Sequence, residues 1–518
     1  MTFGLIPYLG PLVLALAAAV AFRSPGLRPM FALRVSETAG LAAMAIALAS
    51  LAALIVGGST TGSLLVLGGF GFSARLDAVS VTMLMLVSFV GWVVLRYARV
   101  YMDGEDGQGA FTGWICLTLA AVLLLVMSGN LVQLVLGWFA AGAGLIKLLL
   151  TYPDRPGAQR VVRKKRVISF ASDGALILAT IAMAYVFGTG DLATIFSGAE
   201  AGAGWVLSIA ALGLAASAML KSAQFPFHGW LTEVMEAPTP VSALLHAGVI
   251  NAGGFLLIRF ADVMLTSPIV LAVLLMVGGF TALFGGLVML TQPAVKTSLA
   301  WSTVAQMGFM ILQCGLALFP LALLHIVAHS LYKAHAFLAS GEAVQRVAAS
   351  RRPGPVAIPN MRAVLRAFLV ALAIYAVVGA IFGLAAKSPQ AIALGAILIF
   401  GVAYLLAQGF ADAAPKALTQ RTALWSVAVS ASYFALQSAS EWLTAGVLPA
   451  TPSPGPLEWA LILLALISFG IVAVAQATFP LWSVHPSVAG LRVHVSNGFY
   501  VNALIDRWLG NWRIKEVR

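Results

Sequence analysis

Charged side chains are scarce in this chain: Asp, Glu, Lys and Arg make up 9% of its 518 residues. A soluble globular domain carries about 25%. Hydrophobic residues make up 61% of the chain, and its mean hydropathy is +0.98. This composition excludes an ordinary soluble enzyme domain and indicates a polytopic membrane protein.

Cysteine and the common cofactor motifs are also lacking. The two cysteines, Cys116 and Cys314, lie in apolar runs and offer neither a disulfide framework nor the spacing of a metal site. No glycine-rich dinucleotide motif, P-loop or Cys/His cluster occurs, so we expect no cofactor and no metal in this chain. Its net charge is +12, but basic tracts such as RVVRKKR are not interleaved with aromatics. Cytoplasmic anchoring explains these tracts better than nucleic-acid binding.

Long apolar runs fill most of the sequence. A membrane-spanning helix needs about 20 apolar residues, and by this rule we predict an all-α fold with about 13–15 transmembrane helices. The first run lacks the features of a cleavable signal peptide and is expected to remain as a span. A last stretch, Asn497–Trp512, is shorter and amphipathic, which indicates an interfacial helix or a partner-docking segment. The fifteen candidate spans are 5–21, 40–57, 78–98, 111–127, 131–150, 167–187, 205–220, 240–259, 268–290, 298–317, 319–340, 363–386, 391–410, 421–440 and 456–479.

Basic residues alternate between the loops. They gather after the first, third, fifth, eleventh and thirteenth candidate spans, and in the tail. Cytoplasmic loops carry the excess of Lys and Arg, so we predict a multi-pass protein of the cell inner membrane with its N-terminus outside and its C-terminus in the cytoplasm.

The tract KSAQFPFHGWLTEVMEAPTPVSALLHAG, which starts at Lys221, interrupts two apolar runs with three prolines. Irregular backbone at membrane depth is tolerated only inside protein or beside a water-filled cavity. Ionisable groups there are costly and mark functional sites. The presence of Lys221 and His246 in this tract therefore predicts an ion path at a broken helix. Interfacial placement of the lysine is the alternative.

A second group of titratable residues lies in the sequence HIVAHSLYKAH. His325, His329 and Lys333 are spaced i, i+4, i+8, so they share one face of a helix. Imidazole titrates near neutrality, and aligned histidines can pass protons along a file. Each histidine alone could be structural, and the pair also resembles half of a zinc site, but Lys333 disfavours a cation.

The remaining ionisable residues near membrane depth are Asp173, Lys296 and Lys387. Asp173 is the best candidate acid to face Lys221. Glu233 and Glu236 lie in the polar turn of the proline tract, where they form either the point of proton access or a solvated loop. Two further basic residues at span ends, Lys147 and Arg259, are interpreted as interfacial anchors.

These motifs resemble those of a known family. The Lys221 tract, KTSLAWSTVAQMGFM from Lys296 and HIVAHSLYKAHAFLASG from His325 are similar to the antiporter-like subunits of respiratory complex I and of Mrp cation/proton antiporters. The resemblance implies two inverted five-helix repeats, each with a broken helix. We accordingly divide the chain into N-terminal helices (1–110), a first repeat (111–260), a second repeat (261–410) and C-terminal helices with an amphipathic tail (411–518).

The resemblance also implies roles for individual residues. It makes Lys221, His246, Asp173, Lys296, His325, His329, Lys333 and Lys387 parts of the ion pathway, with Lys387 near the end of a second broken helix. One departure stands out. The family carries a glutamate after an LGW tripeptide as the partner of the first lysine, and here Phe139 follows Trp138. Either Asp173 replaces that acid, or this half of the path works differently.

Two further stretches resemble the DabB family of inorganic-carbon transporter subunits: LLLTYPDRPGAQRVVRKKRVISFASDGALILA and LRVHVSNGFYVNALIDRWLG. This resemblance implies a proton- or cation-conducting subunit, not itself an enzyme, that drives CO2 hydration by a zinc-containing DabA-like partner on the cytoplasmic side. A proton-pumping subunit of an NADH-quinone oxidoreductase or of an Mrp antiporter is the alternative. A membrane scaffold with residual ion sites is a third.

Overall fold

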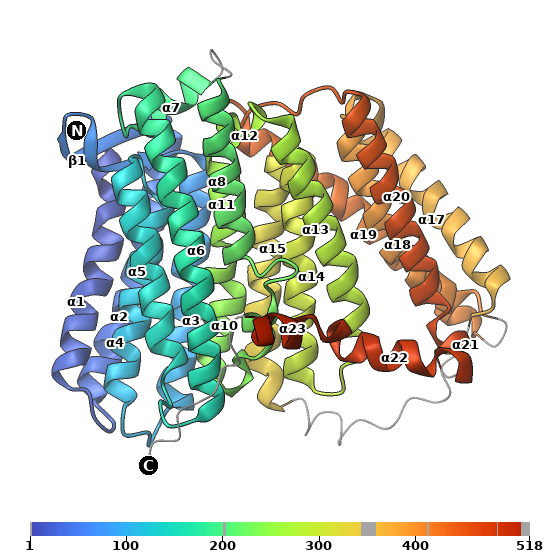
Figure 1. Ribbon diagram of the computed structural model, residues 1–518, viewed down its shortest axis with the longest axis horizontal. Coiled ribbons are helices and arrows are strands. Elements are labelled where there is room, and N and C mark those ends of the chain that lie inside the picture. Colours follow the sequence, from blue (N-terminus) through green and yellow to red (C-terminus); the bar gives the residue numbers. More distant parts are fainter. Residues whose placement is uncertain (1–2, 200–203, 343–358, 412–413, 484, 509–518) are drawn as a thin grey trace.

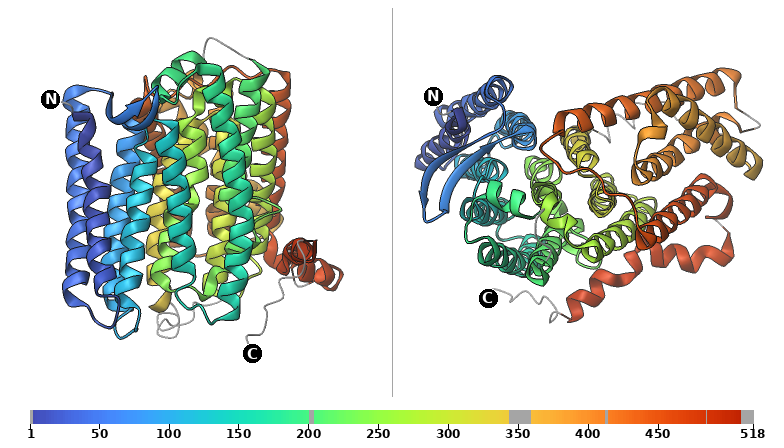
Figure 2. Two further views of the ribbon diagram at one scale, coloured as in Figure 1. Left: turned by 60° about the vertical axis from the view of Figure 1, so that its left-hand side comes forward. Right: turned by 90° about the horizontal axis from the view of Figure 1, so that it is seen from above.

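The computed structural model describes residues 3–199, 204–342, 359–411, 414–483 and 485–508. Most of its helices are roughly parallel or antiparallel to one another and form a bundle (Figures 1 and 2). The last helices of the chain turn and lie across one end of this bundle. We call this end the tail end, and the opposite end, which carries the only strands of the described residues, the hairpin end.

The first part of the bundle consists of η1 and α1–α7, with a β-hairpin between α2 and α3. Their bounds are η1 Phe3–Tyr8, α1 Leu9–Arg23, α2 Met30–Gly57, β1 Thr60–Leu67, β2 Phe70–Leu76, α3 Ala78–Tyr101, α4 Gln108–Val126, α5 Leu131–Leu149, α6 Pro156–Phe187 and α7 Leu192–Ala199.

The hairpin was absent from the sequence-based prediction. Its strands pair antiparallel from Thr60 with Leu76 to Leu67 with Phe70. Gly68 and Gly69 form the turn with φ of 58° and 85°, which glycine adopts at no steric cost. The Asn130 side chain, which caps α5, donates to the Gly69 carbonyl at 3.0 Å. The hairpin therefore fixes the start of the helix that carries Trp138.

The middle of the chain contains short, interrupted helices. They are α8 Trp205–Lys221, α9 Gly229–Thr232, η2 Val234–Glu236, α10 Thr239–Ala247, η3 Val249–Asn251, α11 Ala252–Arg259 and α12 Ala261–Leu265. The predicted helix break is confirmed, since α8 ends at Lys221 and regular structure resumes only at Gly229.

Longer helices follow and lead to the tail. They are α13 Pro268–Met289, α14 Val295–Gly315, α15 Phe319–Leu338, η4 Ala339–Glu342, α17 Met361–Ile381, η5 Leu384–Ala386, α18 Pro389–Gly409, α19 Lys416–Thr444, α20 Pro456–Ala477, α21 Phe479–Trp482, η6 Pro486–Val488, α22 Ala489–Ser496, η7 Gly498–Tyr500 and α23 Val501–Trp508. The predicted interfacial stretch contains η7 and α23, and its last residues, 509–512, lie outside the described ones; α22 precedes it and was not predicted. Helices α22 and α23 lie across the tail end (Figure 1).

Each of the fifteen predicted spans coincides with helical structure. Twelve helices in the described residues are long and apolar enough to cross a membrane. The other three are α8, which is shorter, and α14 and α19, which are 21 and 29 residues long but more polar. The all-α polytopic fold is confirmed.

The apolar core consists of one large cluster and several smaller ones. The large cluster is continuous from α1 to α15, a second joins α17, α18 and α19, and a third links α13, α14 and α15 with α18 and α20. The right-hand view of Figure 2, which is seen from the hairpin end, shows α17–α20 beside the main bundle. Some hydroxyl groups inside the helices are satisfied within their own helix, as where Thr303 donates to the Leu299 carbonyl at 2.9 Å.

Candidate functional site

The break after Lys221 is held by polar groups of neighbouring helices. The Ser222 hydroxyl donates to the Ile250 carbonyl at 3.1 Å, and the Phe225 amide donates to the Thr281 hydroxyl at 3.1 Å. Gly253 lies so close that an added Cβ would be 2.3 Å from Ser222 Oγ. Backbone groups that the break leaves without helical partners are thus satisfied inside protein, as membrane depth requires.

Lys221, Trp138 and Asp173 form the first charged group at this break. The Lys221 ammonium lies 4.4 Å from the centroid of the Trp138 ring, a cation–π distance. The Trp138 indole N–H donates to Asp173 Oδ1 at 3.0 Å. Lys221 is 2% exposed, and its Nζ has no hydrogen-bond partner among the described residues. The structure thus joins lysine and acid through an indole.

Phe139 occupies the place where the family carries its acid. It packs against the apolar core from α5. An added Cβ at Gly142, less than one helical turn further along α5, would lie 3.4 Å from Lys221 Nζ. The helix that carries the family's glutamate therefore does face Lys221, but it presents an aromatic and a glycine there. Asp173 on α6 interacts electrostatically with Lys221.

Two small cavities lie next to this group. One of about 20 Å³ is lined by Lys221, Trp138 and Gly248, and another of about 20 Å³ is lined by Gly248, Asn251 and Ser330. A cavity of about 10–15 Å³ suffices for one water molecule where polar groups are at hand. The two cavities share lining residues of α3 and α4, so they are neighbours between the Lys221 region and α15.

His246 lies fully buried on α10, between α14 and α15. Its Nδ1 is 3.0 Å from the Thr303 hydroxyl, and its ring stacks on Phe337 at 4.3 Å. Its carbonyl accepts a hydrogen bond from His329 Nε2 at 3.2 Å. The sequence singled out both histidines, and the structure brings them together. Thr303 was missed, although it lies inside the quoted α14 motif.

His325 and Lys333 extend this second group along α15. The rings of His325 and His329 are 5.8 Å apart. Both line a cavity of about 550 Å³ between α14, α15 and the helices α18–α20. Lys333 is 0% exposed, and its ammonium donates to the Leu299 carbonyl at 3.0 Å and to the Ser302 hydroxyl at 2.8 Å. The predicted common face is present, with its hairpin-end part beside a wide cavity.

Two predicted pathway residues lie apart from these groups. Lys387 is in the turn between α17 and α18, where it pairs with Glu441 at 3.0 Å. Because α17 is continuous from Met361 to Ile381, Lys387 does not sit within a second helix break. Lys296 is in the first turn of α14, partly exposed, with no ion pair in the part of the chain that the structure describes.

The predicted access residues meet the tail. Glu233 pairs with Lys164 of α6 at 2.6 Å, and Lys164 also pairs with Asp506 of α23 at 2.6 Å. Asn502 donates to Glu233 as well. Glu236 is exposed and lies beside Gly157 in the first turn of α6. Glu233 therefore belongs to an ion-pair network, while Glu236 remains at the surface.

The tract RVVRKKR was predicted to lie in a loop, but it belongs to a helix. Helix α6 begins at Pro156, and it buries Lys164 and Lys165 at 3% and 1% exposure. The signal was present in the sequence, because Val161, Lys165, Ile168 and Ser172 recur at helical spacing on one buried stripe. High local charge hid this periodicity.

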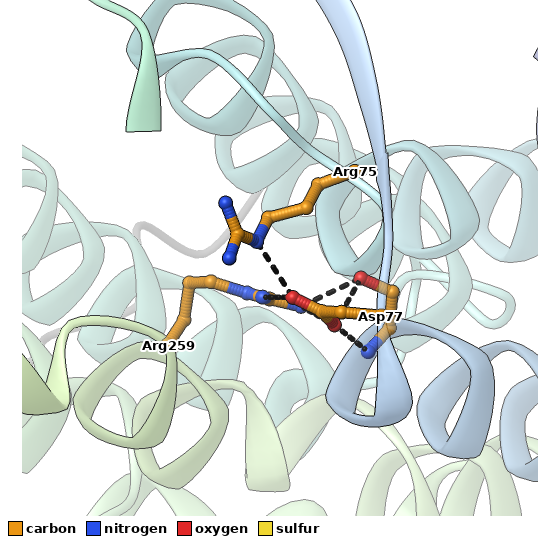
Figure 3. Close-up of polar contacts among 4 residues, drawn as sticks. Arg75, Asp77 and Arg259 are labelled. Carbon is orange, nitrogen blue, oxygen red and sulfur yellow. Dashed lines mark hydrogen bonds and ion pairs between the residues drawn. The ribbon is translucent and has the colours of Figure 1, made fainter. Parts of the chain in front are cut away.

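Arg259 was wrongly interpreted as an interfacial anchor. It is 4% exposed and pairs with Asp77 at 2.6 Å, while Arg75 pairs with the same carboxylate at 2.6 Å (Figure 3). Ser80 donates to Asp77 Oδ1 from both its amide and its hydroxyl. Burial raises the pKa of Asp77, but the two guanidinium groups and Ser80 outweigh burial and hold that pKa well below its usual range. The cluster joins the hairpin, α3 and α11.

Known proteins are similar in sequence to this chain over most of its length. The family described as NADH:quinone oxidoreductase/Mrp antiporter, TM, matches residues 128–377, and the family described as NADH-Ubiquinone oxidoreductase (complex I), chain 5 N-terminus, matches residues 67–112. The probable inorganic carbon transporter subunit DabB2 of Halothiobacillus neapolitanus is 34% identical over 449 residues, which cover 86% of this chain and 80% of that protein. The chain belongs to the antiporter-like family, among its DabB members. The predicted resemblance is thereby confirmed.

A second DabB relative and a solved structure agree. The probable inorganic carbon transporter subunit DabB of Hydrogenovibrio crunogenus is 38% identical over 270 residues, which cover 52% of each chain. The chain thus spans about half of that protein. The structure of the Mrp complex from Dietzia sp. DQ12-45-1b contains a chain with TM-score 0.62 and 23% identity, covering 97% of this chain and 59% of that one. This match supports the fold alone.

Proposed function

We propose that this DabB-family chain is the proton- or cation-conducting subunit of an energy-coupled inorganic carbon transport complex. The single observation that carries the proposal is the Lys221 ammonium, which is buried at a helix break, has no hydrogen-bond partner among the described residues and is linked to Asp173 through Trp138. A fully compensated structural lysine would be hydrogen-bonded. One without a partner is costly at membrane depth unless its charge changes during function.

The supply of energy explains why such a subunit would be needed. Hydration of CO2 by water yields bicarbonate and one proton, and accumulation of bicarbonate above equilibrium requires work. One elementary charge that moves down a potential of 100 mV supplies about 2.3 kcal/mol, enough to sustain a roughly 40-fold concentration ratio. We place the hydration chemistry, with its zinc, in a DabA-like partner on the cytoplasmic side, and we assign only ion movement to this chain.

The polar route has two parts in this proposal. Glu233 and Lys164 at the tail end give access to Asp173 and Lys221. The small cavities beside Gly248 then lead towards His246 and the histidines of α15, which open on the larger cavity. The tail end would face the cytoplasm, since its loops and helix termini hold most of the basic residues.

The test uses cells that make this chain together with its partner. We expect a protonophore to abolish accumulation of labelled inorganic carbon while the amount of assembled complex, measured by co-purification, stays the same. Cells with the partner alone are the control and should accumulate none. Accumulation that persists at full level with the protonophore would overturn proton coupling through this subunit.

A respiratory or Mrp-type antiporter subunit is the second candidate. The match of residues 67–112 to the N-terminal family of complex I chain 5 favours it. In that case the chain would co-purify with quinone-reducing or other antiporter subunits, and NADH oxidation or Na+/H+ exchange would depend on Lys221. Purification of the tagged chain from its native membrane separates the two candidates.

A further inference from the structure

Helix α6 carries a buried lysine that the route above does not use. Lys165 is 1% exposed, and its Nζ lies 4.0 Å from the centroid of the Trp230 ring. Trp230 is also 1% exposed, and its indole N–H has no hydrogen-bond partner among the described residues. An ammonium removed from water is costly unless paired, so a lysine in this place requires an explanation beyond anchoring.

Asp173 lies between Lys165 and Lys221. Lys165 and Asp173 are eight residues apart on α6, about two turns along the same face. Asp173 interacts electrostatically with both lysines, and the two lysines repel each other. Both lysines thus interact with the same carboxylate.

The surroundings of the two lysines are alike. Each ammonium lies over an indole ring, Lys165 over Trp230 and Lys221 over Trp138. A ring face attracts a cation but accepts no proton, so it can hold an ammonium without fixing its protons in one hydrogen-bonded arrangement. The one acid next to both, Asp173, is itself oriented by the Trp138 N–H.

Lys165 also lies next to the network at the tail end. Its neighbour in the sequence, Lys164, pairs with Glu233 and with Asp506, both partly exposed. Glu233 belongs to the same short segment as Trp230. Lys165 therefore lies next to groups that reach solvent, on the helix that also carries Asp173, a half-buried acid that interacts with the buried Lys221.

We propose that Lys165 relays protons between the Lys164–Glu233 network and Asp173. In the step, an N–H bond of the Lys165 ammonium breaks and an O–H bond forms at the Asp173 carboxylate, directly or through one water. That O–H bond then breaks as an N–H bond forms on the neutral amine of Lys221. One proton has moved, and Lys165 regains its own from the solvent-connected network. In place of the missing glutamate at Phe139, Asp173 thus serves two lysines in turn.

This relay rests on the proposed function, and its test separates the two. The full complex is reconstituted in liposomes with a pH-sensitive dye inside, and a potassium diffusion potential drives proton flux. We expect Lys165→Met to lower the flux at least about tenfold, the scale of losing a proton-transfer group. Arg166→Met is the matched control, because it removes the same charge from the exposed side of the same helix.

Lys165→Arg provides the decisive variant. Arginine keeps the positive charge and stacks on aromatic rings, but it does not deprotonate in proteins. A relay therefore predicts that Lys165→Arg conducts as poorly as Lys165→Met, with normal assembly by size-exclusion chromatography. Wild-type flux in either variant would overturn the relay. Should Lys221→Met also conduct normally, the proposed function itself fails; loss of flux in Lys221→Met alone would refute only the relay.

Discussion

The group around Lys221 and the group around Lys333 differ in how their lysines are held. Lys221 lies at a helix break, over an indole, without a hydrogen-bond partner among the described residues and beside a cavity of about 20 Å³. Lys333 lies within a regular helix, donates to a carbonyl and a hydroxyl, and belongs to the helix that lines a cavity of about 550 Å³.

We infer from this difference that the two groups have different roles. A lysine with satisfied donors keeps its proton at low cost, whereas one over a ring face can lose its proton without leaving acceptors unpaired. The Lys221 group is thus suited to change its charge, and the group on α15 is suited to connect a wide cavity with the interior.

The largest effect is expected at Lys221. Lys221→Met should abolish ion flux, by about 100-fold or more, because the titrating group is removed. It should leave thermal stability unchanged or higher, since a buried ammonium without a partner is removed as well. Lys333→Met should lower the melting temperature of the purified complex, since two acceptors lose their donor. Equal losses of stability in both variants would contradict the inference that Lys333 is stabilised by its hydrogen bonds while Lys221 is not.

Arg259→Met should cost stability rather than conduction. It leaves the buried Asp77 carboxylate with Arg75 as its one remaining ion-pair partner among the described residues. Breaking a buried ion pair costs about 3–5 kcal/mol. The double variant Asp77→Asn with Arg259→Met should recover part of this loss, as measured by thermal unfolding in detergent. A single variant that unfolds like the wild type would show that the cluster is not structural.

The same cluster predicts a pH dependence with a definite sign. The pKa of Asp77 is lower in the folded protein than in the unfolded chain. Its stabilisation is therefore present above the unfolded pKa of about 4 and is lost as the pH falls below that value towards the folded pKa. Melting temperatures between pH 3 and pH 7 should fall at the acid end, and less so in Asp77→Asn.

Trp138→Phe should reduce flux by about 5–10-fold, less than Lys221→Met. The ring under Lys221 is kept, but Asp173 loses the N–H donor, and a hydrogen bond to a charged group contributes about 1.5–3 kcal/mol. Trp114→Phe is the control, because that ring lies under Lys147 away from Asp173. Unchanged flux in Trp138→Phe would mean that the indole does not couple acid and lysine.

The histidines of α15 should differ from each other. His329→Gln should reduce flux several-fold, because His329 donates to the His246 carbonyl and closes the link between α10 and α15. His325→Gln should have a smaller effect, because the wide cavity leaves room for water in its place. A larger loss in His325→Gln would reverse the order of access that we infer.

Lys387→Ala should have the smallest effect. It lies in a turn outside the two buried lysine groups, and its partner Glu441 is 42% exposed although the Lys387 side chain is only 10% exposed; ion pairs that reach solvent contribute about 0–1 kcal/mol. Flux within about twofold of the wild type is expected. If flux is lost, the turn between α17 and α18 belongs to the ion path after all.

The sequence predicted most of the fold because its signals are local. Fifteen apolar runs and a proline tract are sufficient to place the helices and the break. The spacing of His325, His329 and Lys333 likewise determines their common face. The hairpin escaped prediction because its two short strands, β1 and β2, lack the length that marks a span.

The errors concern contacts between distant segments. The role of Arg259 depends on Asp77, 182 residues away, and that of Lys164 depends on Glu233 and Asp506. Nothing near these residues in the sequence distinguishes a buried ion pair from an interfacial charge. The link from Lys221 to Asp173 through Trp138 likewise combines three helices, and only their packing shows it.

The tail contact has a consequence for how the protein is made. Asn502 and Lys164, 3.2 Å apart, are separated by 338 residues along the chain. At about 5–20 residues per second, a ribosome needs roughly 20–70 s to pass from one to the other. During that interval α6 is already synthesised while its partners on α23 do not yet exist. The network around Glu233 is therefore completed late in biosynthesis, after the helices that it serves have been inserted.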